Sequence, residues 1–383
     1  MRILLIAKAT KIVTMPSYLP LLFWPLLALG TALAQENHLP LRALWGFEPV
    51  EEFSGTLEQT VRALQDHLVN AVFVSQIAPE LRGALQDSGI KVFTTVNVFG
   101  DNSLWKKYPQ LRPVDQNGQP LPAEPGNGIC PTQRWYWPRI HRDLVKKKED
   151  GFDGLWLDFI RFSGKWEEHN PQFQQNCFCD STLVDFAKTI GFIYPVDTIK
   201  IVTSFDSVAV DSFEIQEMTS AQKASFILSR YGSAWSDYKR NTIADFVRQT
   251  RAKLGEDPGF ILGAFTVPFT REEYGYAITT VLAQDYRRLS DHLDILSPML
   301  YHELCGRSTD WIGEFVKYAA NETNKCIVPI IQSDLGEEHR VTDDEFAAAV
   351  LTALESPSAG VIIFRQQTLL AARQLRMLKA AWQ

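Results

Sequence analysis

Clusters of positive charge are scarce in this chain. Its 38 Lys and Arg residues are outnumbered by 45 Asp and Glu residues, which gives a formal net charge of -7 over 383 residues. The only basic run, Lys146 to Lys148, ends an expected helix, where the helix dipole favours cations. We therefore expect no nucleic-acid partner, and the composition is that of an acidic soluble globular protein.

Several motifs of nucleotide-binding, serine and metal enzymes are also missing. No glycine-rich turn follows the first apolar segment, where Gly46-Phe-Glu48-Pro49 stands instead, which disfavours a dinucleotide-binding open sheet. There is no Gly-x-Ser-x-Gly elbow. The seven His residues are scattered rather than paired at ligand spacing. We expect no cofactor and no metal, and a metal-dependent deacetylase or esterase is a distant third hypothesis.

Cysteine is infrequent, and its five positions leave its role open. An odd number in an exported chain implies at least one unpaired thiol or one intermolecular bridge. Cys177-x-Cys179 resembles half of a metal site, but no second Cys or His pair follows at zinc spacing. A structural disulfide and a set of free thiols both remain possible. The five residues are Cys130, Cys177, Cys179, Cys305 and Cys326.

The first 34 residues differ from the rest of the chain. Basic residues precede an apolar core from Leu19 to Leu29, which ends in Gly30-Thr-Ala-Leu-Ala34. This pattern is typical of a secretory signal peptide and predicts cleavage after Ala34. The mature domain would span residues 35–383 and would be exported to the periplasm or the exterior of a bacterium. A retained anchor is the weaker alternative, because the apolar core is short and interrupted by Pro, so we expect no stable membrane insertion after cleavage.

Apolar runs alternate with helical patterns after residue 34. Apolar residues at spacings of three and four predict helices between the apolar runs. Eight such units predict one (β/α)8 TIM barrel. The expected strands are Arg42 to Phe47, Ala71 to Ser75, Lys91 to Val98, Gly154 to Ile160, Phe260 to Phe265, Leu293 to Leu300, Ile327 to Ile331 and Gly360 to Phe364. The expected helices are Leu57 to Leu68, Leu81 to Asp87, Arg139 to Lys148, Ile243 to Leu254, Trp311 to Ala320 and Phe346 to Leu354.

Two loops are longer than a barrel requires. Gly100 to Thr132 follows the third expected strand, and Ser163 to about Trp235 follows the fourth. Long loops at the carboxyl ends of barrel strands are where substrate pockets and lids are built.

The expected strand that ends at Asp158 presents the clearest functional signal. An apolar run, Gly154-Leu-Trp-Leu, leads into Asp158, and Arg161 follows three residues later. Reacting groups of barrel enzymes lie where strands end at the carboxyl rim. Pairing with Arg161 would keep Asp158 ionised and suit it to a nucleophile or base. Trp156 shares the parity of Asp158 and is expected to face the helices, so that a bulge would be needed to re-aim Asp158.

Aromatic, amide and charged groups at the other strand ends suggest a surface for carbohydrate. Hydrolysis of a glycosidic bond usually needs two carboxyl groups, one on each side of the bond. Glu303 is the leading candidate for the acid that accompanies Asp158, ahead of Glu48, Glu272 and Asp334. The expected substrate-binding residues are Trp45, Glu48, Asn97, Arg161, Tyr301, His302, Gln332 and Arg365.

These residues carry a family resemblance. The chain resembles bacterial glycosyl-hydrolase-like TIM barrels of export pathways, which are distantly similar to hydrolase barrels that act on exopolysaccharides. The resemblance spans roughly Leu41 to Arg365 and implies a glycosidase with Asp158 as one catalytic carboxylate, without settling the acid. Relatives usually have a third Cys soon after the Cys-x-Cys pair, which this chain lacks. The segments concerned are Gly151 to Phe162, Cys177 to Phe186, Trp235 to Arg240 and Asp294 to His302.

Two functions compete on this sequence. One is an exported glycoside hydrolase that acts on an oligo- or polysaccharide, and the alternative is a non-catalytic carbohydrate-binding TIM barrel. The fold cannot separate them, because barrels support many functions. The discriminating feature is a second carboxyl group about 5 to 10 Å from Asp158.

Overall fold

A computed structural model describes residues 40–48, 55–191, 218–355, 357–366 and 371–383. The expected signal peptide, residues 1–34, lies outside the described residues, as does part of the expected second long loop. Residues 40–383 form one compact unit. No helix in the described part of the chain is long and apolar enough to cross a membrane.

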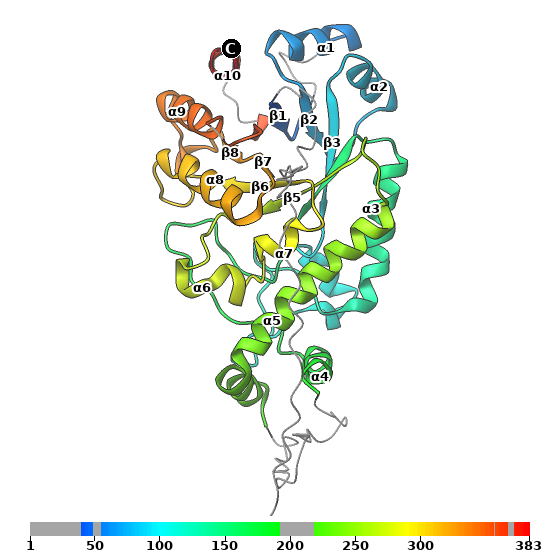
Figure 1. The fold of residues 1–383 in the computed structure, drawn as a ribbon, viewed down its shortest axis with the longest axis vertical. Coiled ribbons are helices and arrows are strands. Elements are labelled where there is room, and N and C mark those ends of the chain that lie inside the picture. Colours follow the sequence, from blue (N-terminus) through cyan, green and yellow to red (C-terminus); the bar gives the residue numbers. More distant parts are fainter. Residues whose placement is uncertain (1–39, 49–54, 192–217, 356, 367–370) are drawn as a thin grey trace, which may run out of the picture. The chain divides into compact units, whose positions relative to one another are not determined.

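Parallel strands close into a barrel in this unit (Figure 1). The strands follow one another around the barrel in chain order, and β5 pairs with β6 while β1 pairs with β9, so no edge is left between first and last strands. The predicted TIM barrel is therefore confirmed. The strands are β1 (Leu41–Trp45), β2 (Ala71–Val74), β3 (Lys91–Asn97), β4 (Gly154–Asp158), β5 (Ile261–Thr266), β6 (Ile295–Leu300), β7 (Cys326–Ile327), β8 (Ile330–Gln332) and β9 (Gly360–Phe364).

The seventh strand position of the barrel is occupied by two short strands rather than by one. β7 and β8 both pair with β6, and Val328 and Pro329 separate them. Proline has no backbone N–H to give to a neighbouring strand, so the regular ladder is interrupted there. The carbonyl of Pro329 still accepts from the N–H of Ile362 on β9. β7 and β8 together fill the single position that the sequence predicts, so nine named strands make an eight-stranded barrel.

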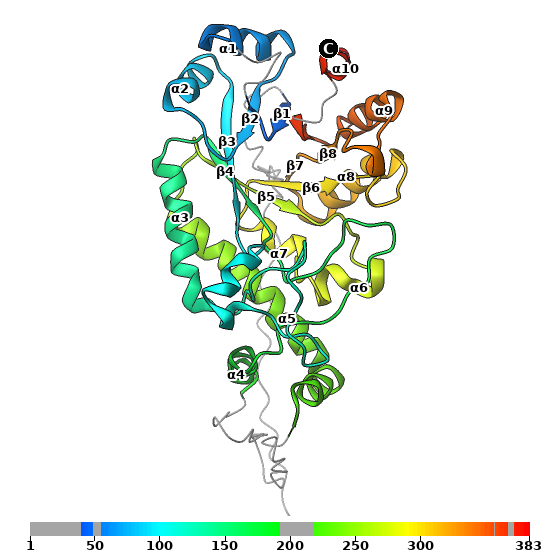
Figure 2. The ribbon, with the colours of Figure 1, turned by 180° about the vertical axis from the view of Figure 1, so that it is seen from behind.

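Helices alternate with the strands, as the sequence predicts. Threonine capping boxes at Thr56, Thr219 and Thr342 start three of them, because the hydroxyl accepts from an otherwise unpaired N–H. α2 lies against β3, and α3 lies beside α5 (Figure 2). The helices are α1 (Leu57–Asp66), α2 (Pro79–Asp87), α3 (Trp137–Glu149), α4 (Asp180–Thr189), α5 (Ser220–Leu254), α6 (Glu273–Thr280), α7 (Tyr286–Ser290), α8 (Asp310–Thr323), α9 (Asp343–Ala353) and α10 (Ala371–Trp382).

Helix α5 is longer than expected. The sequence pattern predicts a helix only from Ile243, whereas α5 begins at Ser220 and is kinked at Tyr231. Its first half packs on α4 through Phe178, Phe186 and Trp235. This small apolar cluster stabilises helix within the segment that the sequence assigns to a loop.

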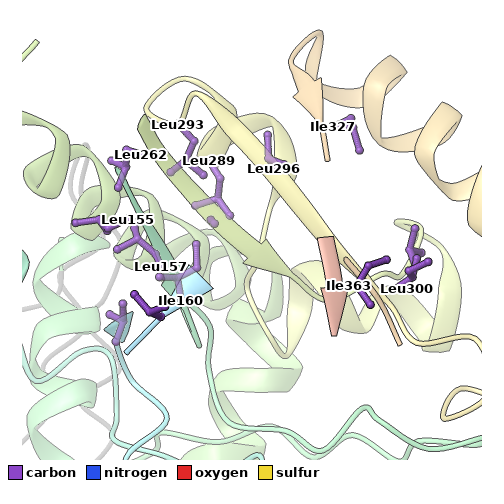
Figure 3. Close-up of a cluster of buried hydrophobic side chains, with 14 of the residues drawn as sticks. Leu155, Leu157, Ile160, Leu262, Leu289, Leu293, Leu296, Leu300, Ile327 and Ile363 are labelled. Atoms are coloured by element: carbon purple, nitrogen blue, oxygen red, sulfur yellow. The ribbon is translucent and has the colours of Figure 1, made fainter. Parts of the chain in front are cut away.

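Two apolar layers surround the strands. One lies between the strands and the helices and contains aliphatic side chains from β4, β5 and β6, such as Leu155, Leu262 and Leu296 (Figure 3). The other fills the barrel interior and is richer in aromatic rings. Its strand members include Ala43, Phe73, Phe93, Trp156, Phe265, Met299, Ile330 and Ile362.

Trp156 lies inside the barrel, so the expectation that it faces the helices is wrong. Its ring centroid lies 4.8 Å from those of Phe73 and Phe93. Gly263 on β5 provides the room, because a Cβ there would lie only 2.2 Å from the indole. Asp158 shares the inward parity of Trp156, two residues further along β4. No bulge is needed to turn Asp158 toward the mouth of the barrel.

Candidate active site

The carboxyl ends of β3 and β4 bring two predicted site residues together. Asn97 and Asp158 are register partners at the ends of these neighbouring parallel strands. Side chains that share a face of the sheet recur every second residue, so both residues continue the inward rows of Phe93 and Trp156. The side-chain oxygen of Asn97 accepts from the N–H of Gly100, which fixes the start of the first long loop.

Asp158 is partly buried at this mouth. One carboxylate oxygen accepts from the N–H of Phe159 at 2.8 Å. Burial raises the pKa of Asp158 to about 6, although the Phe159 N–H and the charge of Arg161 act in the opposite direction. The expectation that Arg161 holds this pKa low is therefore wrong, because loss of hydration outweighs the attraction of the guanidinium. A pKa near 6 suits a proton donor.

Arg161 is directed toward the backbone of the rim loops. It is 4% exposed, and its guanidinium donates to the carbonyls of Phe162 at 3.1 Å and Gly164 at 2.9 Å. The guanidinium also lies 4.9 Å from the ring of Phe159. Burial lowers the pKa of Arg161 to about 10, so it stays cationic at neutral pH. The structure thus gives Arg161 a role in holding the loop, whereas the sequence predicts a substrate contact.

Glu167 is a candidate that the sequence argument misses. It follows Trp166 in the loop after β4 and keeps an exposed face, yet the surrounding protein reduces the hydration of its carboxyl and raises its pKa. Its charge in turn raises the pKa of Asp158 and that of Tyr301. Glu167 lies well beyond the end of β4, so a search limited to the residues at strand ends does not find it. The available signal is a carboxylate next to a Trp in a long rim loop.

Aromatic rings form a continuous chain around part of the mouth. Trp45 at the end of β1 lies 4.8 Å from Phe364 at the end of β9, and Phe364 lies 5.0 Å from Tyr301, measured between ring centroids. Tyr301 stacks on Trp166 at 5.9 Å. Trp45 and Phe364 remain partly exposed. The predicted residues Trp45 and Tyr301 thus belong to one aromatic surface, which extends to the loop that carries Glu167.

Tyr301 stays a neutral phenol under physiological conditions. It is 4% exposed, and burial raises its pKa well above the usual value. The charges of Glu167 and Asp158 add to this rise. Both carboxylates therefore raise the pKa of the same phenol. The charges at the end of β4 and in the loop after it thus affect the residue that follows β6.

Gln332 on β8 offers an amide beneath the mouth. It is fully buried and shares the inward parity of Ile330. Its oxygen accepts from the N–H of Leu304 at 3.2 Å, while its amide nitrogen has no hydrogen-bond partner among the described residues. A buried donor without a partner is energetically costly.

Two predicted residues, His302 and Glu303, lie in the segment after β6. His302 is 3% exposed, burial lowers its pKa, and the charges of Glu345 on α9 and Glu303 act on it. One carboxylate oxygen of Glu303 lies 3.0 Å from Nδ1 of His339. Glu303 is not among the charges that shift the pKa of Asp158. Its role as the catalytic acid stays a prediction, with Glu167 the carboxyl that acts on Asp158.

Glu48 and Arg365 lie at the seam between the first and last strands. The N–H of Glu48 donates to the side-chain oxygen of Gln366 at 3.0 Å. The N–H of Arg365 donates to the hydroxyl of Ser333 at 3.1 Å. Both side chains are exposed, so they are accessible to a ligand that covers this part of the rim.

The described residues contain no group of three His, Cys, Asp or Glu side chains arranged to hold a metal ion. The five cysteines are all free thiols in the structure. Within the described part of the chain, the rim therefore offers carboxyl, phenol, amide and aromatic groups. These can bind hydroxyl groups and exchange protons with a ligand.

Comparisons with solved structures reveal the same barrel in carbohydrate enzymes. A β-galactosidase from the psychrophilic Marinomonas ef1 shares 14% identity, with 89% of this chain and 59% of that chain covered and a TM-score of 0.59. A β-galactosidase from Bacillus circulans sp. alkalophilus shares 11% identity over 91% of this chain and 56% of that chain, with a TM-score of 0.56. The α-L-fucosidase isoenzyme 2 from Paenibacillus thiaminolyticus shares 13% identity over 90% of this chain and 49% of that chain, with a TM-score of 0.54.

At these identities the likeness shows the fold alone. The chain spans 59% or less of the length of these three enzymes. A comparison with curated proteins finds no match. The model of the family described as "Putative glycosyl hydrolase domain" (DUF4015) matches residues 56–309, which include β4, its rim loop and β6. Because this match covers more than half of the sequence, the chain belongs to that glycosyl hydrolase family.

Proposed function

We propose that this protein is an exported glycoside hydrolase that cleaves glycosidic bonds in an oligo- or polysaccharide. The observation that carries the proposal is the pair Asp158 and Glu167. Asp158 ends a barrel strand with a pKa of about 6, and the negative charge of Glu167 contributes to that value. Two interacting carboxyl groups at the mouth of a barrel are the groups that glycoside hydrolysis requires.

The pair divides the acid and base roles. Asp158 holds its proton to higher pH than an exposed carboxyl, and it can give that proton to the oxygen of the leaving sugar. Burial raises the pKa of Glu167, but the cations Arg161 and Lys165 oppose this rise and favour its ionised form. An ionised Glu167 can activate a water molecule or attack the anomeric carbon. We place Glu167 ahead of Glu303 for this role, because Glu303 contacts His339 instead.

The surrounding residues are suited to hold a sugar. Aromatic rings such as Trp45 present apolar faces that fit the C–H surfaces of a pyranose. Amides of Asn97 and Gln332 and the phenol of Tyr301 supply donors and acceptors for hydroxyl groups. A buried phenol that cannot ionise in the physiological range serves as a steady hydrogen-bond donor.

Export is part of the proposal and derives from residues 1–34. Their basic start, apolar core and small-residue end are those of a signal peptide, so the periplasm or the exterior of a bacterium is the proposed location. The substrate would then be a polymer or oligomer met outside the cytoplasm.

The deciding experiment is hydrolysis of bacterial exopolysaccharides and aryl glycosides by the purified chain and its variants. Asp158→Asn and Glu167→Gln should each lower kcat/KM by about 100-fold or more, since both remove a reacting group. Glu168→Gln is the matched control, because Glu168 adjoins Glu167 but pairs with Lys165. The loss of kcat/KM in Glu303→Gln, compared with that in Glu167→Gln, shows which of the two residues is the second catalytic carboxyl.

The outcomes separate the two hypotheses. Hydrolysis by the parent that is lost in Asp158→Asn, with an unchanged circular dichroism spectrum, supports the hydrolase. Hydrolysis that persists in Asp158→Asn contradicts the assignment of that residue. If the parent and all the variants bind glycan but none hydrolyses it, the protein is a non-catalytic carbohydrate-binding barrel rather than a hydrolase.

A further inference from the structure

Three cysteines meet where the two long rim loops come together. Cys130 lies in the loop after β3, and Cys177 and Cys179 lie just before α4. The loops are joined by the N–H of Phe178, which donates to the carbonyl of Val114 at 3.0 Å. Cys130 and Cys177 are buried, whereas Cys179 keeps an accessible face. This group of residues, Cys130, Cys177 and Cys179, is called the thiol cluster below.

Thr182 links two members of the thiol cluster. Its hydroxyl oxygen lies 3.6 Å from the sulfur of Cys130 and 2.8 Å from the sulfur of Cys179. The sulfurs of Cys130 and Cys179 therefore contact the same oxygen atom and are neighbours in the fold. Burial raises the pKa of Cys130, and its hydrogen bond with Cys177 adds to the rise, whereas its hydrogen bond with Cys179 acts against it. The three sulfurs therefore share one small, largely buried space.

We propose that Cys130 and Cys179 form a disulfide that joins the two rim loops, while Cys177 remains a thiol beside it. Cys179 is preferred over Cys177 for two reasons. It shares the Thr182 hydroxyl with Cys130, and its accessible face lets an oxidant reach it. The proposed bond is a modification site separate from the Asp158 and Glu167 pair.

The bond forms by exchange with a small disulfide, such as oxidised glutathione. The thiolate of Cys179 attacks one sulfur of that disulfide and expels a thiolate, which leaves a mixed disulfide on Cys179. The thiolate of Cys130 then attacks the Cys179 sulfur and expels the second small thiolate. The two cysteine protons end on two small thiols, so the cysteines are oxidised and the reagent is reduced.

Burial raises the pKa of Cys130 and Cys177, and a hydrogen bond with Cys130 together with burial raises the pKa of Cys179. Thiolates are therefore rare in the folded protein. We therefore expect the exchange to be slow in the folded protein and to begin at the accessible Cys179, and we expect the bond to be slow to reduce afterwards. The bond would close a loop that includes β4, Asp158 and Glu167, so it would fix the rim loops on both sides of the proposed site.

The test is a count of thiols in the full chain after refolding in a glutathione redox buffer. The unreduced chain, alkylated in denaturant, should show three of its five cysteines as free thiols. Cys130→Ala and Cys179→Ala should each show four, because each loses the bridge. Cys177→Ala should keep the bridge and show two, and the exposed Cys326→Ala serves as the matched control with the same count.

Two further readings complete the test. Mass spectrometry of an unreduced digest of the parent should find the peptide of Cys130 linked to the peptide that contains Cys179. The melting temperature of the parent should fall by about 5 °C on reduction. The readings do not use enzymatic activity, so they stand or fall independently of the proposed hydrolase.

Four outcomes would overturn the proposal. Five free thiols in the refolded parent would show that no bridge forms. A bridge that survives Cys179→Ala but not Cys177→Ala would assign the bond to the other thiol. A pairing that includes Cys305 or Cys326 would place it elsewhere. One zinc ion per chain, released by alkylation of the cluster, would make the cluster a metal site.

Discussion

Trp156 and Ser297 are joined across the interior of the barrel: the indole Nε1 of Trp156 on β4 donates to the hydroxyl of Ser297 on β6 at 2.9 Å. Both side chains are fully buried. The buried indole N–H of Trp156 thereby finds its hydrogen-bond acceptor on β6, which is not a neighbour of β4 in the sheet. Asp158 lies two residues further along the same face of β4.

We expect Ser297→Ala to lower the free energy of unfolding by about 1 to 3 kcal/mol, because the indole N–H would be left buried without a partner. Chemical denaturation of parent and variant measures the change. Ser229→Ala is the matched control, since the Ser229 hydroxyl is exposed on α5. An equal effect of the two substitutions would contradict the role assigned to the bond.

Asp158→Asn should stabilise the protein at neutral and alkaline pH while it removes hydrolysis. The folded-state pKa of about 6 lies above the unfolded value of about 3.9, so the folded chain binds more protons between these values and stability falls as pH rises through them. Asparagine carries no charge and keeps an acceptor for the Phe159 N–H.

The gain should be on the order of 1 to 3 kcal/mol at pH 8 and should vanish by pH 4. Unfolding by denaturant across this pH range measures it. A gain that is equal at pH 4 and pH 8 would show that the pKa of Asp158 is not raised by the fold.

Glu167→Gln should lower the pKa of Asp158. Removal of a nearby negative charge makes ionisation of the remaining carboxyl easier. NMR titration of the side-chain carboxyl of Asp158, in the parent and the variant, measures the shift. Glu168→Gln should leave that pKa unchanged, and a similar shift in both variants would remove the specific link between Glu167 and Asp158.

Lys239 on α5 should make stability depend on pH above neutrality. It is fully buried, its ammonium donates to the carbonyl of Val281 at 2.6 Å, and burial lowers its pKa to about 7. An unfolded Lys titrates near 10.4, so the unfolded chain binds more protons between the two values and stability rises with pH there.

Lys239→Met abolishes this contribution. The stability of the parent relative to Lys239→Met should rise by about 2 kcal/mol between pH 7 and pH 9. Lys223→Met is the control, because Lys223 pairs with an exposed Asp180 at the surface. A constant difference between parent and Lys239→Met over this range would contradict the lowered pKa.

The barrel could be predicted from the sequence because its strands are buried on both faces. Segments such as Gly154 to Leu157 are apolar without interruption, and helical patterns separate them. The boundaries of the strands shift by only a few residues, with the seventh interrupted at Pro329. α5 was less predictable, because the contacts that stabilise its first half, from Phe178 and Phe186 to Trp235, come from a distant segment.

The place of the candidate site at the rim could be predicted from the strand ends, whereas the expected direction of Trp156 was wrong. The closed sheet brings the carboxyl ends of its strands to one rim, and five predicted residues lie at or directly after such ends: Trp45, Asn97, Asp158, Tyr301 and Gln332. Electrostatics were less predictable, since the pKa of Asp158 depends on burial and on a loop residue. Arg161 follows Asp158 closely in sequence, but loop carbonyls hold its guanidinium.

The pairing of β1 with β9 has a consequence for how the protein folds. Residues 41–45 find their second neighbour only when residues 360–364 are available, so no shorter stretch of the chain closes the cylinder. Such distant pairing is slow, and until it occurs the outer strands keep unpaired backbone groups. Trp45 and Phe364 meet across this junction. The aromatic surface that includes Trp45, Phe364 and Tyr301 is therefore one of the last features that a newly synthesised chain acquires.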